Sequence, residues 1–205
     1  RIQDVIARIE PHDSVERYTE LGVEVLQGYG RLIDPWTVEI TLNSGEVQKL
    51  TGRAIVIAAG AEPAVPPLQG LDEVGYLTSD TLWSALAEEE SAPKRLLVLG
   101  GGPIGCELAQ SFARLGSSVT QLEIIEFDTL LCAVGRKPRS KGYGLENLDI
   151  DTSKLEGNDY LETRFPHILL AGDVVGPYQF THVAAHQAWY AAVKGLFGDF
   201  KKFKV

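Results

Sequence analysis

The chain has 205 residues, of which 44% are hydrophobic and 23% charged, and its formal net charge is −9. This composition is ordinary for a globular protein of one large or two small domains. The net negative charge argues against a nucleic-acid partner, which would need clustered lysine and arginine. It does not exclude a nucleotide cofactor, because helix N-termini and backbone amides bind phosphates without positive side chains.

Cysteine content and hydropathy narrow the class of protein further. Cys106 and Cys132 fit neither a disulfide framework nor a C-x-x-C redox pair nor a zinc cluster, so we interpret both as reduced packing residues. The sequence has no run of about 18 apolar residues that would predict a membrane span. Its first residues, RIQDVIARIE, are charged and helical and do not resemble a signal peptide. We therefore expect a cytoplasmic protein.

The first part of the chain predicts a helix followed by four strands. Apolar residues at helical spacing predict a helix over 1–22. VEVLQGYGRLIDPWTVEITL predicts strands at 23–26, 29–33 and 38–42 with turn residues between them. RAIVIAAG (53–60) is a continuous apolar run that ends in glycine, which is typical of a strand buried on both faces.

The middle of the chain predicts a strand–helix–strand unit after a proline-rich connection. AEPAVPPLQG (61–70) excludes a helix. SDTLWSALAEEE (79–90) predicts a helix with Ser79 or Asp80 as its N-cap. LLVLGGGPIGCELAQSFARLGSSVTQLE (96–123) then predicts a buried strand, a glycine turn, a helix over 104–115 and a second strand that ends at Glu123.

The last part of the chain predicts two more buried strands and a final helix. FDTLLCAVG (127–135) and HILLAGD (167–173) are apolar runs that end in Gly or Gly-Asp, with a polar, irregular stretch at 142–157 between them. The final helix covers 181–198. Parallel α/β sheets bind ligands where their strands end, so the pattern predicts an α/β fold with ligand sites at those ends.

Gly100, Gly102 and Gly105 form a G-x-G-x-x-G pattern between a predicted strand and a predicted helix, which is the context that a dinucleotide fingerprint requires. The first glycine allows the tight turn, the second lets a pyrophosphate approach, and the third lets the helix pack close to the strand. Glu123, at the end of the next strand, can accept hydrogen bonds from the adenine-ribose hydroxyls. The alternative is a tight turn of small packing residues without a ligand.

Two other strand ends and a pair of histidines have more than one interpretation. Gly60 could let the backbone pass an extended cofactor, or it could simply end a strand. Asp173 at the tip of a buried strand needs hydrogen-bond donors, which a polyol such as a ribityl chain or the next helix could supply. His182 and His186 share one predicted helix face, but no third ligand stands nearby, and so we expect no metal site.

Three motifs occur in order: IVIAAGAEPAVP, VLGGGPIGCELAQSFARLGSSVTQLE and TRFPHILLAGDVVG. Together they resemble the class I pyridine nucleotide–disulfide oxidoreductases, the family of dihydrolipoamide dehydrogenase, glutathione reductase and mercuric reductase. FDTLLCAVGRKPRS is similar to the segment where such chains leave the NAD domain for the FAD domain, and PYQFTHVAAHQA looks nearer to mercuric reductase. The resemblance implies Rossmann-like domains that pass electrons from NADH through FAD to a disulfide, a dithiol or a thiol-bound substrate.

The resemblance also implies site residues and a homodimeric parent enzyme that acts on a small-molecule or dithiol substrate. The N-terminus of the final helix would point at the flavin ring, where its dipole favours negative charge. No catalytic residue and no metal ligand are assigned to this chain. The implied NAD contacts are Gly100, Gly102, Pro103, Ile104, Gly105, Glu123 and Gly135, and the implied FAD contacts are Ala59, Gly60, Gly172, Asp173, Thr181 and His182.

Several segments of the family have no counterpart in this sequence. We expect the fingerprint for the FAD pyrophosphate, the C-x-x-x-x-C disulfide and the dimerisation domain with its His–Glu pair to be absent. A parallel crossover needs about 10–12 residues or more, so the strand ending at Glu123 cannot run straight on into the next strand. We therefore place a seam near 123–124, with an incomplete NAD-binding domain at 91–137 and an incomplete FAD-binding domain at 1–90 and 138–205.

Two other functions remain open at this point. The chain could belong to a disulfide-independent NADH:flavin reductase or oxidase of the same architecture, or it could be a non-catalytic NAD-binding module. The reading frame upstream of Arg1 distinguishes them. A glycine fingerprint followed by C-x-x-x-x-C supports the disulfide reductase, a fingerprint without cysteines supports the reductase or oxidase, and a start codon near Arg1 supports the module.

Overall fold

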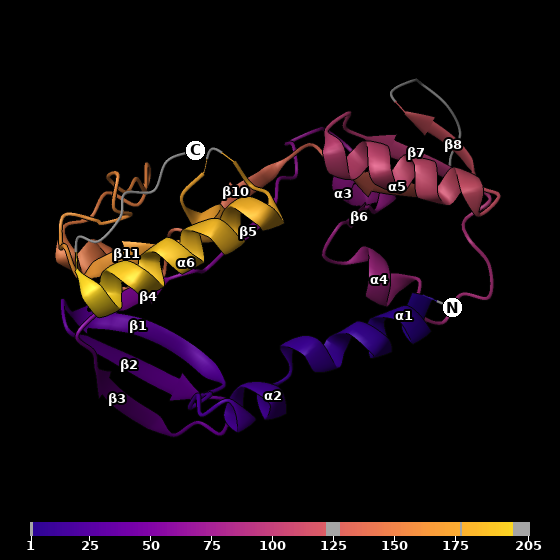
Figure 1. The fold of residues 1–205 in the computed structure, drawn as a ribbon. Helices are drawn as coiled ribbons and strands as arrows, with labels where there is room; N and C mark the ends of the chain where they lie inside the picture. The colour runs from indigo at the N-terminus through magenta and orange to yellow at the C-terminus, as the bar shows by residue number, and fades with distance from the viewer. Residues whose placement is uncertain (1, 122–127, 177, 199–205) are drawn as a thin grey trace. The chain divides into compact units, whose positions relative to one another are not determined.

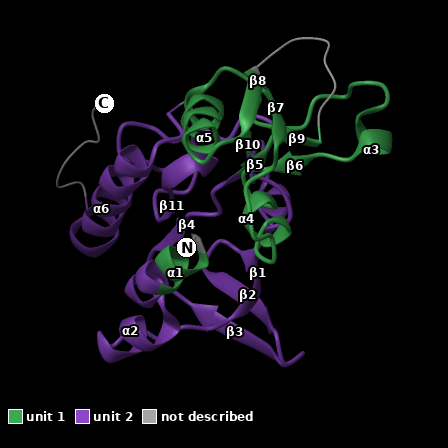
Figure 2. Cartoon of the chain, turned by 90° about the vertical axis from the view of Figure 1, so that its right-hand side faces the viewer, with its two compact units in different colours: residues 1–7, 62–137 green, residues 8–61, 138–205 purple. Residues whose placement is uncertain are grey.

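The computed structural model describes residues 2–121, 128–176 and 178–198, and the chain divides into two compact units (Figures 1 and 2). Unit 1, green in Figure 2, comprises Arg1–Ala7 and Glu62–Lys137. Unit 2, purple, comprises Arg8–Ala61 and Pro138–Val205. We had expected 62–90 to belong with the first and last segments of the chain, whereas the structure groups these residues with 91–137.

Unit 1 is built on a four-stranded parallel sheet with the strand order β6–β9–β7–β8. The predicted strand–helix–strand unit is confirmed, because helix α5 (Pro103–Arg114) connects the neighbouring parallel strands β7 and β8 and lies over the sheet (Figure 1). Glu123 and Phe127, at the predicted ends of two strands, lie outside the described residues. The strands are β6 (Leu77–Thr78), β7 (Arg95–Leu99), β8 (Ser118–Gln121) and β9 (Thr129–Cys132).

Both faces of this sheet carry apolar side chains, as expected for a parallel sheet. Along β7, Leu96 and Val98 pack with Phe112 of α5, whereas Leu97 and Leu99 belong to a cluster on the opposite face. Two one-turn helices complete the two clusters, each through a buried leucine. These helices are α3 (Leu71–Val74), which contributes Leu71, and α4 (Leu82–Ala85), which contributes Leu82.

The helix predicted over 79–90 is mostly absent, and only α4 forms. Just before α4, the backbone N–H of Thr78 donates to the hydroxyl of Thr81 at 3.0 Å, and the N–H of Thr81 donates to the hydroxyl of Thr78 at 3.3 Å. Reciprocal bonds of this kind between residues three apart fix the turn at 78–81 that leads into α4. Thr81 therefore occupies the N-cap position that we had assigned to Ser79 or Asp80.

Unit 2 combines an antiparallel sheet with a pair of parallel strands. Helix α6 (Thr181–Phe197) contacts both parallel strands, and irregular chain with the single turns η2 (Glu146–Leu148) and η3 (Gly172–Val174) completes the unit. The antiparallel strands are β1 (Gly28–Asp34), β2 (Thr37–Leu42) and β3 (Val47–Thr51), and the parallel strands are β4 (Ile55–Ile57) and β11 (Ile168–Leu170). Short strands β5 (Ala61–Pro63) and β10 (Arg136–Pro138) pair where the chain changes unit.

Two strand predictions in unit 2 were wrong, and one strand was not predicted. Residues 23–26 form no strand, and β3 was not expected; it pairs with β2 through the turn at Gly45, which has a φ of +88°. The strand predicted over 53–60 is limited to β4. Val56 in that strand is 44% exposed, so the strand is not buried on both faces within the described chain.

The helix predicted over 1–22 is divided into α1 (Ile2–Ile9), a turn η1 (Glu10–Asp13) and α2 (Val15–Glu20). Pro11 interrupts it because proline offers no backbone N–H to the helix. Ser14 then caps α2 by accepting a hydrogen bond from the N–H of Arg17 at 3.3 Å. Within the described part of the chain, none of the helices combines the length and the apolar character that crossing a bilayer would require.

Candidate functional site

A pocket lies at the edge of the unit 1 sheet where β6, β7 and β9 end. The carboxyl ends of parallel strands meet at one edge, which is where such sheets hold their ligands. The pocket is therefore formed by three loops that are distant in sequence, together with Pro63 of β5. Its lining residues are Pro63, Ser79, Gly100, Gly101, Gly102, Pro103, Ile104, Cys132, Ala133, Val134 and Gly135.

Two of the fingerprint glycines are required by the protein's own backbone. Gly100 has a φ of +124°, and a Cβ there would lie 2.3 Å from the carbonyl oxygen of Ala133. A Cβ on Gly105 would lie 2.3 Å from the carbonyl oxygen of Gly100. Both glycines therefore allow β7, the end of β9 and helix α5 to approach one another closely, as the fingerprint predicts.

Gly102 is different, because nothing in the protein requires a glycine there. It has a φ of −75°, and a Cβ at this position would meet no atom within 4 Å. Gly102 lines the pocket, so the absence of a side chain leaves space on the pocket side of the turn. This is the geometry expected where a ligand, and not the protein, approaches the backbone.

The N-terminus of α5 opens at the same place. Gly102 is the N-cap residue, Pro103 is the first helical residue, and no side chain caps this end of the helix. The first backbone N–H groups of a helix have no intrahelical partner, and its N-terminus carries partial positive charge. The pocket can therefore bind the phosphates of a nucleotide without a cationic side chain.

Most of the residues predicted to contact NAD lie together in this pocket. Gly100, Gly102, Pro103, Ile104 and Gly135 all line it, whereas Gly105 is buried behind the turn. Glu123 lies outside the described residues, so its position relative to the pocket stays a prediction.

The sequence analysis did not assign six of the lining residues to the site: Pro63, Ser79, Gly101, Cys132, Ala133 and Val134. Ser79 is held at the rim by Arg136, whose guanidinium donates to the Ser79 hydroxyl at 3.1 Å and to the Asp80 carboxylate at 3.2 Å. In the sequence, Ser79 could have been found only through its position directly after strand β6. A strand of two residues is too short to be predicted from the sequence. Burial raises the pKa of the Cys132 thiol above its ordinary value, so this group stays neutral near neutral pH.

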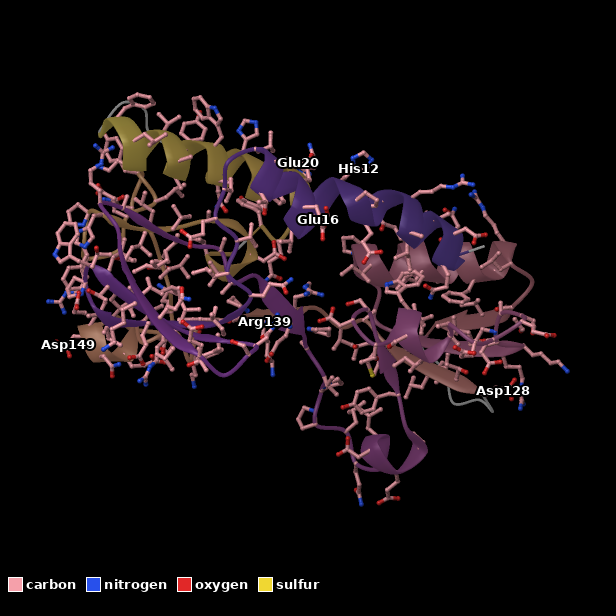
Figure 3. All side chains as sticks on the ribbon, turned by 90° about the horizontal axis from the view of Figure 1, so that it is seen from below. His12, Glu16, Glu20, Asp128, Arg139 and Asp149 are labelled. Carbon is pink, nitrogen blue, oxygen red and sulfur yellow. The ribbon has the colours of Figure 1, made fainter. Side chains whose placement is uncertain are left out.

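A second set of predicted contacts lies at the corresponding edge of unit 2. Because β4 and β11 are parallel, Gly60 and Asp173 follow the ends of neighbouring strands. The N–H of Ala171 donates to the carbonyl of Ile57 at 3.0 Å and continues the ladder to the point where the strands end. Gly60 (φ +70°) accepts a hydrogen bond from the N–H of Arg139, labelled in Figure 3, at 2.9 Å.

The start of α6 also lies beside this edge. A Cβ on Gly172 would lie 3.6 Å from the Cβ of Ala184, which places the first turns of the helix against the Gly172–Asp173 turn. Thr181 and His182 begin the helix and are exposed, and the His182 ring stacks on Phe180 with 5.5 Å between centroids. The described residues contain no group of three or more potential His, Cys, Asp or Glu ligands for a metal ion.

Unit 1 has a Rossmann-like dinucleotide-binding fold, which is defined by the strand β7, the glycine turn and the uncapped helix α5. This is the fold class that the motifs predicted. The sequence model of one family, described as pyridine nucleotide-disulphide oxidoreductase, matches residues 4–125 and 120–188. These matches cover most of the chain, and the chain belongs to this family. The resemblance that the sequence motifs suggested is confirmed.

Curated relatives point to the same family. The chain is 30% identical to a mercuric reductase from Streptomyces lividans over 89% of its own length, 29% identical to a mercuric reductase from Staphylococcus aureus over 94%, and 29% identical to a mitochondrial dihydrolipoyl dehydrogenase from Dictyostelium discoideum over 78%. It spans about half the length of these relatives: 51%, 44% and 45%, respectively.

Solved structures agree on the fold. A Cu(II) complex of a cysteine-to-serine mutant of the flavoprotein disulfide reductase RclA from Escherichia coli matches with a TM-score of 0.75 at 24% identity, covering 87% of this chain and 52% of that one. LpdA from Mycobacterium tuberculosis matches with a TM-score of 0.71 at 21% identity, covering 91% of this chain and 53% of that one. At these identities the likeness establishes the fold alone.

The alignments also bear on the middle of unit 1. The alignment with the S. aureus enzyme is 250 residues long. This chain contributes 94% of its 205 residues to that alignment, so part of the aligned stretch of the S. aureus enzyme has no counterpart here. The two family matches meet at 120–125. The predicted seam near 123–124 falls in that interval, outside the described residues.

Proposed function

We propose that this chain forms the nucleotide-binding part of an FAD-dependent oxidoreductase that passes electrons from NADH through FAD to a disulfide, a dithiol or a thiol-bound substrate. Unit 1 binds NAD and unit 2 binds FAD. The observation that carries the proposal is the pocket at the N-terminus of α5, where Gly102 leaves space beside uncapped backbone amides. Family membership and the named relatives support the same function.

In unit 1, Gly102 and the first turn of α5 would hold the pyrophosphate of NAD, and the backbone N–H groups there would donate hydrogen bonds to its oxygens. Gly135 also lines the pocket, and a Cβ there would meet nothing within 4 Å. Glu123 accepts hydrogen bonds from the adenine ribose and disfavours a 2′-phosphate by charge repulsion. The chain therefore uses NADH in preference to NADPH.

In unit 2, the half-buried Asp173 carboxylate accepts hydrogen bonds from the ribityl hydroxyls of FAD. Ala59 and Gly60 allow the backbone to lie along the cofactor, and the N-terminus of α6 at Thr181 and His182 presents partial positive charge to it. When bound, FAD would supply the two-electron chemistry between nicotinamide and sulfur. The residues of this chain bind and orient the cofactor and stabilise negative charge on it.

The dithiol that such a reaction needs is not formed by Cys106 and Cys132. Both are unpaired thiols; Cys106 is exposed on α5 and Cys132 is buried in β9. A disulfide exchange step requires an accessible thiolate with a partner thiol nearby, and neither cysteine has a second cysteine within five residues. We propose that the thiols come from outside these 205 residues, and that the parent enzyme is a cytoplasmic homodimer.

Calorimetric titration of the purified chain with NADH, and separately with FAD, tests the proposal. We expect saturable binding of both, loss of NADH binding in Gly102→Val, and loss of FAD binding in Asp173→Ala. Gly30→Ala is the matched control, because a Cβ there meets only Val38 at an ordinary 3.5 Å and strand β1 contributes no residue to either predicted contact set. Absence of NADH binding by the parent chain would refute the unit 1 assignment.

Assaying NADH-dependent reduction of a small dithiol acceptor by the same chain tests the source of the thiols. We expect no turnover. Turnover that is lost in Cys106→Ser or Cys132→Ser would show that a cysteine of this chain takes part in the reaction.

A further inference from the structure

We infer that Gln187 is a positioning residue that sets the orientation of the Gly172–Asp173 turn for FAD. The inference rests on the proposed FAD-binding role of that turn. Gln187 lies two turns into α6, within the PYQFTHVAAHQA stretch, and the sequence analysis assigned it no role. Its side-chain oxygen accepts a hydrogen bond from the backbone N–H of Gly172 at 2.8 Å.

Burial makes this contact unusual for a glutamine. Gln187 is 5% exposed and is one of three buried polar or charged residues in the described chain. Glutamine is mostly found at the surface, and a buried amide is retained in a core only when it is hydrogen-bonded. The amide of Gln187 therefore has a specific partner, and that partner is the backbone of the predicted FAD-binding turn.

The turn needs an acceptor at this place because the chain leaves the sheet there. The ladder of hydrogen bonds between β4 and β11 ends with the bond from the N–H of Ala171 to the carbonyl of Ile57. Gly172 then adopts a φ of +79°, which directs the chain out of the strand. The carbonyl of Gly172 accepts from the N–H of Val175 at 3.0 Å. Its N–H has no strand partner, and the side chain of Gln187 supplies the acceptor.

The contact joins the turn to a rigid element. Ala184 and Gln187, three residues apart on α6, both face Gly172, since a Cβ on Gly172 would lie 3.6 Å from Ala184. The turn is thus held by β4 on one side and α6 on the other. Fixing Gly172 between them fixes the backbone from which the Asp173 carboxylate extends.

Two substitutions separate the hydrogen bond from side-chain volume. Gln187→Leu keeps a side chain of similar size without the acceptor, whereas Gln187→Glu keeps an acceptor oxygen in either protonation state. Gln179→Leu is the matched control, because the Gln179 amide approaches the same turn only at the carbonyl of Asp173 and at 3.5 Å.

The experiment measures amide hydrogen exchange by NMR and FAD affinity by titration for the purified chain and the three variants. We expect Gln187→Leu to raise exchange at the Gly172 amide, and to raise the Kd for FAD, by about tenfold each (about 1.4 kcal/mol). Gln187→Glu and Gln179→Leu should stay within about threefold of the parent in both measurements (below about 0.7 kcal/mol).

Unchanged exchange at Gly172 in Gln187→Leu would overturn the inference. A uniform rise in exchange throughout α6 and β11 would also overturn it, because Gln187 would then only stabilise the core. If the parent chain does not bind FAD, the proposed function of unit 2 fails, while exchange at Gly172 still decides whether Gln187 positions the turn.

Discussion

Replacing Gly100 by alanine should unfold unit 1 more readily, whereas the same replacement at Gly102 should leave the unit folded and weaken NADH binding. The two residues lie in one turn and two positions apart. At Gly100 the new Cβ would lie 2.3 Å from the carbonyl oxygen of Ala133 on a backbone with a φ of +124°. At Gly102 it would meet nothing within 4 Å.

The magnitude at Gly100 follows from strain and overpacking. A non-glycine residue held in such a conformation costs about 1–3 kcal/mol, and forcing an extra carbon into a packed region costs about 1–3 kcal/mol more. We expect a loss of about 2–6 kcal/mol, which lowers the Tm of a unit of this size by roughly 10 °C or more. At Gly102, alanine is a poorer N-cap than glycine, and the loss should stay below about 1 kcal/mol.

The affinity for NADH should show the opposite order from stability, with the expected loss at Gly102. A methyl group on Gly102 occupies space that we assign to the NAD pyrophosphate, and we expect the Kd for NADH to rise about tenfold, or about 1.4 kcal/mol. Thermal unfolding by circular dichroism and calorimetric titration with NADH measure the two effects. Equal stability of Gly100→Ala and the parent chain would refute the packing argument, and unchanged NADH affinity in Gly102→Ala would refute the assignment of the pocket.

Three further predictions concern charge and thiol chemistry. The guanidinium of Arg95 donates two hydrogen bonds to the carboxylate of Asp128, labelled in Figure 3, and the backbone N–H of Arg95 donates a third, which together lower the pKa of that carboxyl below its ordinary value of 3.8. The stabilisation is present above the unfolded-state pKa and is lost as the pH falls through the lower folded value. Asp128→Asn should therefore flatten the acid limb of a plot of Tm against pH. A maleimide at neutral pH should label the exposed Cys106 and leave the buried Cys132 unmodified until denaturant is added, as mass spectrometry of the digested chain can show. Glu123 should favour NADH over NADPH. A carboxylate at about 4 Å from the 2′-phosphate of NADPH repels that phosphate by about 4 kcal/mol per unit charge at an effective dielectric of 20, before solvent and mobility reduce this value. A lower Kd for NADPH than for NADH would contradict the assignment.

Local signals predicted the central element of unit 1 correctly. The β7–α5–β8 segment combines an apolar run, a glycine turn that ends in Pro103, and an amphipathic helix, and all of these lie within one continuous stretch. The tasks assigned to Gly100 and Gly105 also agree with the structure, because they concern the packing of this segment against itself and the next strand.

Predictions failed where tertiary contacts or side-chain hydrogen bonds decided the conformation. Of the helix expected over 79–90 only α4 formed, and it follows a turn in which Thr78 and Thr81 bond each other's backbone. The two-residue strand β6 has no periodicity to detect, and its pairing with β9 is what places 77–78 in the unit 1 sheet. For that reason the predicted domain boundary near residue 90 differs from the division at Glu62.

The family, the glycine fingerprint and the β7–α5–β8 segment could be predicted from residue types alone, because each of these depends on residues at short spacing. Only the tertiary structure decided that Ser79 and Cys132 join the fingerprint in one pocket, and that Gln187 meets Gly172. The physical reason is that parallel strands bring their carboxyl ends to one edge whatever their separation along the chain. No local pattern records which distant loops, or which residue of a packed helix, will meet there.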